Sequence, residues 1–234
     1  MERLNKVLFL SVFVSTALAT SSGNTSTLNN IIHTKSYSDS TKVVQDTVVK
    51  VNDNFDFAYK AFKYYNPEID SATVNQFVKV CEFYNFNTTK STFKLLVGQI
   101  LIESGAKHYK NGNINIGGGG HIGIAQISPK YGLAIMVKHV TDEDLKTFRY
   151  LSNDSTLVKP TTYSQSVKWL SNKNNNLIFW GYMMSRNMKS LPTENALVRY
   201  NAGPGGYQSY VNSGRKIQNH HYIIGIRGKL SKII

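Results

Sequence analysis

The stretch LLVGQILIESG, residues 95–105, decides the fold because it joins an apolar helix to a carboxylate. Leu96, Ile100 and Glu103 stand at positions i, i+4 and i+7, so a helix places their side chains on one face. The rest of that face is apolar. A carboxylate at the margin of a hydrophobic core loses part of its hydration, which raises its pKa. Glu103 is therefore the first candidate for acid–base chemistry.

Capping residues mark the ends of this helix and of the one before it. Thr88 or Thr89 can begin the helix that carries Glu103, and Asp70 or Ser71 can begin the preceding helix. Gly105 can end the first of these in a left-handed conformation. The helix is thus expected to stop directly after the carboxylate.

Helical patterns cover most of the remaining chain. Apolar residues recur at helical spacing in segments 43–66, 70–85, 88–104, 176–188, 192–201 and part of 207–229. Residues 111–123 are rich in Gly and Asn and predict a loop or a short irregular hairpin. Residues 141–170 mix polar turns with short helices. We expect a mainly α fold with a small irregular or β element beside the cleft that holds the site.

Two further segments accompany Glu103-Ser104-Gly105, namely GIAQISP at 123–129 and RYNAGPG at 199–205. Together and in this order, the three resemble the catalytic domain of soluble-type lytic transglycosylases, a branch of the lysozyme-like superfamily. The resemblance covers about residues 77–226 and implies an α+β lysozyme-like fold.

The chain departs from the family pattern in three places. The gap between Glu103 and Gln126 is a few residues longer, and the extra length falls in the glycine-rich loop. The segment NLIFWG at 176–181 resembles a further family stretch, but Trp180 stands where that stretch usually has Gly. The segment HHYI, which begins at His220, resembles an Arg-x-Tyr-Val stretch with His in place of Arg.

The resemblance implies an enzyme that cleaves the β-1,4 bond between N-acetylmuramic acid and N-acetylglucosamine in peptidoglycan without water. Glu103 would protonate the glycosidic oxygen and then take the proton of the muramic acid C6 hydroxyl, which leaves a 1,6-anhydro end. No cofactor and no metal would be needed. The Tyr200 hydroxyl would orient Glu103 by a hydrogen bond. Gln126 and Asn201 would contact the sugars or hold the groove, with Ser128 beside them.

The spacing of the carboxylates bears on this mechanism. Hydrolytic glycosidases usually employ two carboxyl groups, and the related goose-type lysozymes typically have an Asp where Ser128 stands. One alternative is therefore a hydrolytic muramidase on the same fold that recruits a second carboxylate from Asp142, Glu143, Asp144 or Asp154. A second is a non-catalytic wall-binding or structural component of a secretion system or a virion.

The first residues are typical of an export signal. A short basic start is followed by a largely apolar run from Val7 to Ala19, and Ala17-Leu18-Ala19 fits an A-x-A cleavage site. The run is shorter than the roughly 20 apolar residues that span a bilayer, although a retained anchor or a buried helix is the alternative. We predict a signal peptide at 1–19, a flexible Ser/Thr/Asn-rich linker at 20–42 and the catalytic domain at 43–234. The protein would act in the periplasm or after secretion, as a bacterial or a phage-encoded enzyme.

The net charge indicates which kinds of partner the protein binds, and the cysteine and histidine residues bear on metal binding. The formal net charge is +13, and removal of residues 1–19 lowers it by one. Such a charge attracts anionic polymers, and the basic residues form no nucleic-acid motif. We expect peptidoglycan and anionic cell-wall polymers as partners, no nucleic acid, and no membrane-spanning segment in the mature chain. Cys81 is the sole cysteine and its helical spacing predicts a core position, whereas the pair His220-His221 lacks further metal ligands nearby.

The signal sequence leads to a direct prediction. If cleavage follows Ala19, N-terminal sequencing of the exported protein will begin at Thr20. Recovery of the protein from the membrane fraction with Met1 still in place would contradict it and favour a retained anchor.

Overall fold

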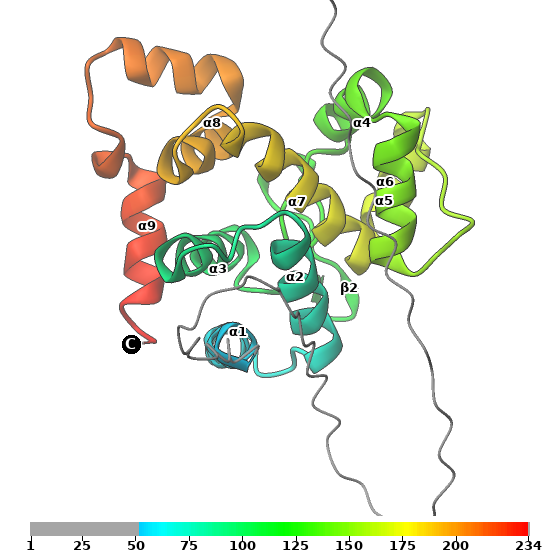
Figure 1. Ribbon diagram of the computed structural model, residues 1–234, viewed down its shortest axis with the longest axis horizontal. Helices are drawn as coiled ribbons and strands as arrows, with labels where there is room; N and C mark the ends of the chain where they lie inside the picture. The colour runs from blue at the N-terminus through cyan, green and yellow to red at the C-terminus, as the bar shows by residue number, and fades with distance from the viewer. Residues whose placement is uncertain (1–51, 234) are drawn as a thin grey trace, which may run out of the picture. The chain divides into compact units, whose positions relative to one another are not determined.

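The computed structural model describes residues 52–233 (Figure 1). The described part contains nine α-helices, two short 3-10 helices and one small antiparallel hairpin. The prediction of a mainly α fold with a small β element is confirmed. The predicted signal peptide, the linker and the start of the first helix near Val43 lie outside the described residues.

The helices and strands follow one another in chain order. They are α1 (Asn52–Tyr65), α2 (Ser71–Phe83), α3 (Lys90–Ser104), β1 (Tyr109–Lys110), β2 (Asn113–Ile114), η1 (Gly118–Gly120), α4 (Pro129–His139), α5 (Asp142–Ser152), α6 (Tyr163–Leu170), α7 (Lys173–Met188), α8 (Thr193–Asn212), η2 (Ile217–Asn219) and α9 (His221–Leu230). In the hairpin, Tyr109 pairs with Ile114 and Lys110 with Asn113.

The predicted caps of α2 and α3 are confirmed. The Asp70 side chain accepts a hydrogen bond from the backbone N–H of Thr73, and Thr89 caps α3 in the same way. Gly105 ends α3 with φ of 64°, the left-handed conformation that glycine adopts without steric cost. The ends of α3 are thus set by residues within it or next to it, which is why the sequence predicts them.

The core forms around α3 and α7. The α3 helix packs against α1, α8 and α9, and α7 packs against α2, α5, α6 and α8. Figure 1 shows α9 next to α3, against which it packs. Fully buried aromatic rings fill the space between α2 and α7, where Phe77 and Trp180 stack with centroids 5.3 Å apart. Cys81 is fully buried in this core, as predicted, and burial raises the pKa of its thiol.

Two segments are more helical than the sequence patterns predict. The α4 helix begins at Pro129, which occupies a first-turn position where its missing N–H costs nothing. The predicted helix at 192–201 ends as expected near Gly203, where φ is 70° and ψ is 169°. A second helical arm then runs from Pro204 to Asn212, because proline is tolerated in the first turn of a helix.

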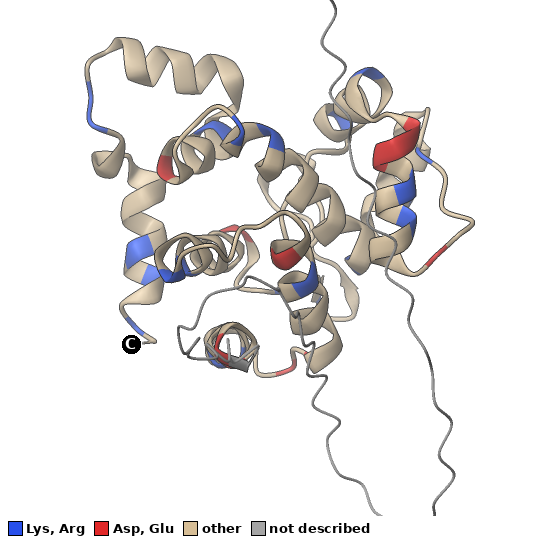
Figure 2. Ribbon diagram, in the orientation of Figure 1, with Lys and Arg blue, Asp and Glu red and all other residues tan. Residues whose placement is uncertain are grey.

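Two features of the described region bear on partners. No helix within residues 52–233 combines the length and the apolar character needed to cross a membrane. Lys and Arg residues are spread over many helices rather than gathered in one stripe (Figure 2).

Candidate active site

Glu103 lies in the last turn of α3, and its side chain is partly buried. The Tyr222 hydroxyl, from the first turn of α9, donates a hydrogen bond to Glu103 Oε1. Glu103 Oε2 makes no hydrogen bond with any residue in the described range. One carboxyl oxygen is therefore held by Tyr222, and the other has no hydrogen-bond partner among residues 52–233.

The surroundings raise the pKa of Glu103 to about 7 from an ordinary value of 4.5. Burial is the cause, because it penalises the charged form, and the hydrogen bond from Tyr222 opposes it in part. A general acid is most effective when its pKa lies near the working pH. At neutral pH, Glu103 thus divides between a protonated form that can donate and an ionised form that can accept.

A short loop, residues 122–127, lies against the end of α3 and is held by hydrogen bonds to its backbone. Ser104 Oγ, beside Glu103, donates to the carbonyl of Ile124 at 2.6 Å. The Tyr200 hydroxyl from α8 donates to the next carbonyl, Ala125, at 2.8 Å. These two bonds connect the three segments on which the family resemblance depends, so segments far apart in sequence meet at Glu103.

Two buried polar side chains hold the other side of this loop. His108 Nδ1 accepts from the Ile124 N–H at 3.2 Å, which makes Nε2 the protonated nitrogen, and Nε2 donates to the Ser171 carbonyl at 2.9 Å. Asn176 is fully buried on α7; its Oδ1 accepts from the Ala125 N–H at 3.0 Å. The Asn176 amide donates to two backbone carbonyls, one of them in the loop. The backbone N–H and C=O groups of Ile124 and Ala125 thus each have a side-chain partner, which favours one conformation of the loop.

Gln126 occupies the end of the loop and has φ of 49°, an uncommon value for a residue with a side chain. Its Nε2 donates to the Gly123 carbonyl at 2.7 Å and to the Asn115 carbonyl at 3.3 Å. Its Oε1 reaches so close to Gly117 that a Cβ there would lie 1.9 Å away. Of the two roles predicted for Gln126, this geometry favours the structural one, because both amide N–H groups are used to hold the loop.

The prediction that Tyr200 hydrogen-bonds Glu103 was wrong. The Tyr200 hydroxyl donates to the Ala125 carbonyl; burial raises the pKa of this phenol, and the nearby charge of Glu103 adds to the rise. Tyr222 orients Glu103 instead. His220 caps α9 by accepting the Tyr222 N–H at its Nδ1, 3.2 Å away, and this bond helps to place Tyr222. The resemblance of HHYI to a family stretch was the available signal for Tyr222.

The remaining predicted residues lie at the edge of the site. Ser128 caps α4, because its Oγ accepts the Tyr131 N–H at 3.4 Å. Asn201 follows Tyr200 on α8 and is exposed. The hydrogen bond to Tyr131 gives Ser128 a structural role as the cap of α4, whereas the exposed side chain of Asn201 is accessible to a ligand.

The four carboxylates of the hydrolytic alternative lie elsewhere. Asp142, Glu143 and Asp144 form the first turn of α5, and Asp154 follows that helix. The α5 helix packs against α2 and α7, and it lies apart from α3 in Figure 2. Asp144 caps its own helix, and Asp154 accepts hydrogen bonds from Thr156. Within the described part of the chain, no carboxylate contributes to the pKa of Glu103.

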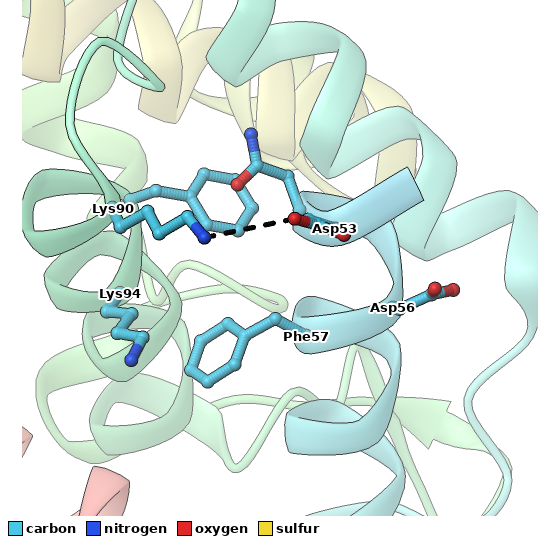
Figure 3. A pocket seen from close by; sticks show the side chains of 7 residues that line it. Asp53, Asp56, Phe57, Lys90 and Lys94 are labelled. Carbon is cyan, nitrogen blue, oxygen red and sulfur yellow. Dashed lines mark ion pairs between the residues drawn. The ribbon is translucent and has the colours of Figure 1, made fainter. Parts of the chain in front are cut away.

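A cavity of about 250 Å³ lies between the first turns of α1 and α3, at the opposite end of α3 from Glu103 (Figure 3). It contains two exposed carboxylates, Asp53 and Asp56, and the first forms an ion pair with Lys90 at 3.8 Å. Lys94 lies over the Phe57 ring. These carboxylates remain hydrated and lack the hydrophobic surroundings of Glu103, so the cavity is the weaker candidate.

The loop geometry predicts unequal effects of two matched substitutions. Gly123 and Gly112 have nearly equal φ values, 78° and 77°, but a Cβ at Gly123 would lie 2.7 Å from Asn176 Nδ2, whereas a Cβ at Gly112 meets nothing within 4 Å. Both Gly→Ala changes incur the left-handed cost of roughly 1–2 kcal/mol. Gly123→Ala will lower the free energy of unfolding by about 1–3 kcal/mol more, because it also forces apart a packed core. Urea denaturation of both variants measures this difference, and equal losses would contradict the packing of the loop.

The raised pKa of Glu103 also predicts a pH-dependent stability. The folded chain binds this proton more tightly than the unfolded chain, so ionisation lowers the free energy of unfolding as pH rises from about 4.5 to about 7. Glu103→Gln does not ionise. The variant will match the wild type near pH 4 and exceed it at pH 8, by about 1–3 kcal/mol after allowance for solvent screening of a partly exposed group.

Urea denaturation at the two pH values tests this prediction, since contributions from other titrating groups cancel between variant and wild type. A stability difference that is the same at pH 4 and pH 8 would mean that Glu103 titrates normally.

Comparisons with known proteins do not assign the chain to a family. No protein-family model matches the chain, and searches of curated proteins and of solved structures found no significant match.

Proposed function

We propose that this protein is a peptidoglycan lytic transglycosylase that uses Glu103 as its single acid–base group. One observation carries the proposal. A glutamate with a pKa near 7 is held at one oxygen by Tyr222 and lies where the three family-like segments converge. The resemblance of those segments supplies the substrate class, and the geometry around Glu103 supports the chemistry.

The first half of the reaction uses the protonated carboxyl. Because Tyr222 occupies Oε1, the proton sits on Oε2, from which it passes to the glycosidic oxygen. The bond between that oxygen and the anomeric carbon of muramic acid breaks, and the N-acetylglucosamine side leaves as an alcohol. Glu103 is now a carboxylate, which the Tyr222 hydrogen bond stabilises.

The second half of the reaction uses that carboxylate as a base. The C6 hydroxyl of the same muramic acid attacks the anomeric carbon, and its proton goes to Glu103. A 1,6-anhydro ring forms, the carboxyl regains its starting state, and no water is consumed. The substrate thus provides the nucleophile, which agrees with the lack of carboxylate influence on the pKa of Glu103 within residues 52–233.

The proposed partners and location follow from the substrate. Peptidoglycan lies outside the cytoplasm, so the activity requires export. A net charge of +13 favours association with anionic wall polymers around that substrate.

Mass spectrometry of muropeptides released from purified sacculi tests the proposal directly. We expect products that end in 1,6-anhydromuramic acid. Products with reducing muramic ends would instead identify a hydrolytic muramidase, and Asp142→Asn, Glu143→Gln, Asp144→Asn and Asp154→Asn would then locate its second carboxylate. The absence of any cleavage would favour a wall-binding or structural component.

Substitution of Glu103 tests its role. Glu103→Gln keeps the size of the side chain and removes the transferable proton. General acid–base catalysis typically contributes about 10²–10⁴-fold, so turnover of sacculi will fall at least about a hundredfold. Glu82→Gln, which changes an exposed glutamate on α2, serves as the matched control and will leave turnover nearly unchanged.

Thermal unfolding of both variants separates a catalytic loss from a folding defect. A folded Glu103→Gln protein with nearly full activity would overturn the assignment of Glu103.

A further inference from the structure

Behind the Tyr222–Glu103 pair lies a fully buried amide, Gln99, one helical turn before Glu103 on α3. Its Oε1 accepts a hydrogen bond from the Trp180 indole N–H at 3.0 Å. An indole N–H can only donate, so this bond fixes which end of the amide faces Trp180. Gln99 Nε2 must therefore point the other way.

The free end of this amide acts on Tyr222. Gln99 Nε2 has no well-aligned hydrogen-bond acceptor among the described residues. Burial and the charge of Glu103 raise the pKa of the Tyr222 phenol, and the Gln99 amide lies close enough to that hydroxyl to oppose the rise as a hydrogen-bond partner. A fully buried N–H without an acceptor is costly, so the phenol oxygen is the acceptor that this site offers. A phenol oxygen that accepts from Gln99 directs its own proton toward Glu103.

The packing around Trp180 fixes the indole N–H that orients Gln99. Its ring is fully buried and stacks on Phe77, and Phe86 contacts it edge-on with centroids 6.2 Å apart. The indole N–H therefore has one position, set by the packing of α2 against α7.

We infer that Gln99 and Trp180 are positioning residues that set the donor strength of Tyr222 toward Glu103. Trp180 orients Gln99, Gln99 orients and polarises the Tyr222 hydroxyl, and that hydroxyl stabilises the ionised form of Glu103. Each donor strengthens the next, because hydrogen bonds in a chain polarise one another. The inference extends the proposed function from the catalytic carboxylate to the core residues behind it.

Few other groups act on Glu103. Tyr222 from α9 and Tyr200 from α8 are the titratable side chains coupled to it. Within residues 52–233, no Lys, Arg, Asp or other Glu contributes to its pKa. A change in that pKa after a substitution at Gln99 or Trp180 therefore reports on Tyr222.

Two substitutions interrupt the arrangement at different points. Gln99→Met keeps the volume and removes the amide, and Trp180→Phe keeps an aromatic ring and removes the N–H. Each weakens donation by Tyr222, so the pKa of Glu103 will rise by about 0.1–0.6 unit, since a neighbour strengthens a hydrogen bond by about 10–30%. Tyr222→Phe removes the whole bond and will raise it further, by about one to two units.

Trp169→Phe provides the matched control. Trp169 is also buried, and its Nε1 likewise has no partner in the described region, but it packs against Phe148 and Phe179, away from Gln99. Its removal can destabilise the core as much as Trp180→Phe does. The pKa of Glu103 will not move in this variant.

The measurement is a carboxyl carbon NMR titration of protein labelled at its six glutamates, with Glu103 assigned from the Glu103→Gln spectrum. This titration needs no substrate, so it tests the inference even if sacculi are not cleaved. Where cleavage occurs, the alkaline limb of the pH–rate profile will move upward by the same amount. The inference is overturned if folded Gln99→Met and Trp180→Phe proteins titrate as the wild type, or if Trp169→Phe shifts Glu103 equally.

Discussion

The close packing of α9 along α3 is the constraint on which the rest of the site depends. Two glycines make it possible, one on each helix. A Cβ at Gly98 would lie 2.7 Å from Ile226 Cγ2, and a Cβ at Gly225 would lie 2.3 Å from Ile102 Cδ1. A side chain at Gly98 would also lie 3.1 Å from Leu230, so the interface would have to shift there, and such a shift would change the placement of the Tyr222 hydroxyl against the carboxyl that it orients. The apolar helix interface and the placement of Tyr222 against Glu103 therefore depend on each other.

The loop at 122–127 complements this helix pair with polar contacts. Its backbone is held by side chains from three helices and from the segment before the hairpin. These contacts hold the loop in addition to the burial of its apolar side chains, Ile122, Ile124, Ala125 and Ile127. This arrangement explains why Gly123 and Gln126 both adopt left-handed conformations, since the loop must turn sharply within reach of all four partners.

Local signals account for what the sequence predicts well. The caps of α2 and α3, the end of α8's first arm at Gly203 and the margin position of Glu103 each depend on residues within a few positions. The choice between Tyr200 and Tyr222 as the partner of Glu103 depends instead on how α8 and α9 pack against α3, which no local pattern encodes. The start of α4 at Pro129 is equally hard to predict locally, because a proline can either begin a helix or interrupt a regular segment. Trp180 could be predicted only in part. The sequence shows that it departs from the family pattern, but its hydrogen bond to Gln99 depends on the placement of α7 relative to α3.

Two opposed effects meet at Glu103, and their balance gives the site its chemistry. Burial alone would hold the carboxyl in its neutral form and leave it a poor base after the first proton transfer. A strong hydrogen bond alone would hold it ionised and leave it a poor acid. Tyr222 supplies a single donor from a buried position, so the ionised form is supported without being made dominant. A carboxyl that must act as acid and then as base in one turnover needs this intermediate balance, and a second nearby carboxylate would disturb it by raising the cost of ionisation further.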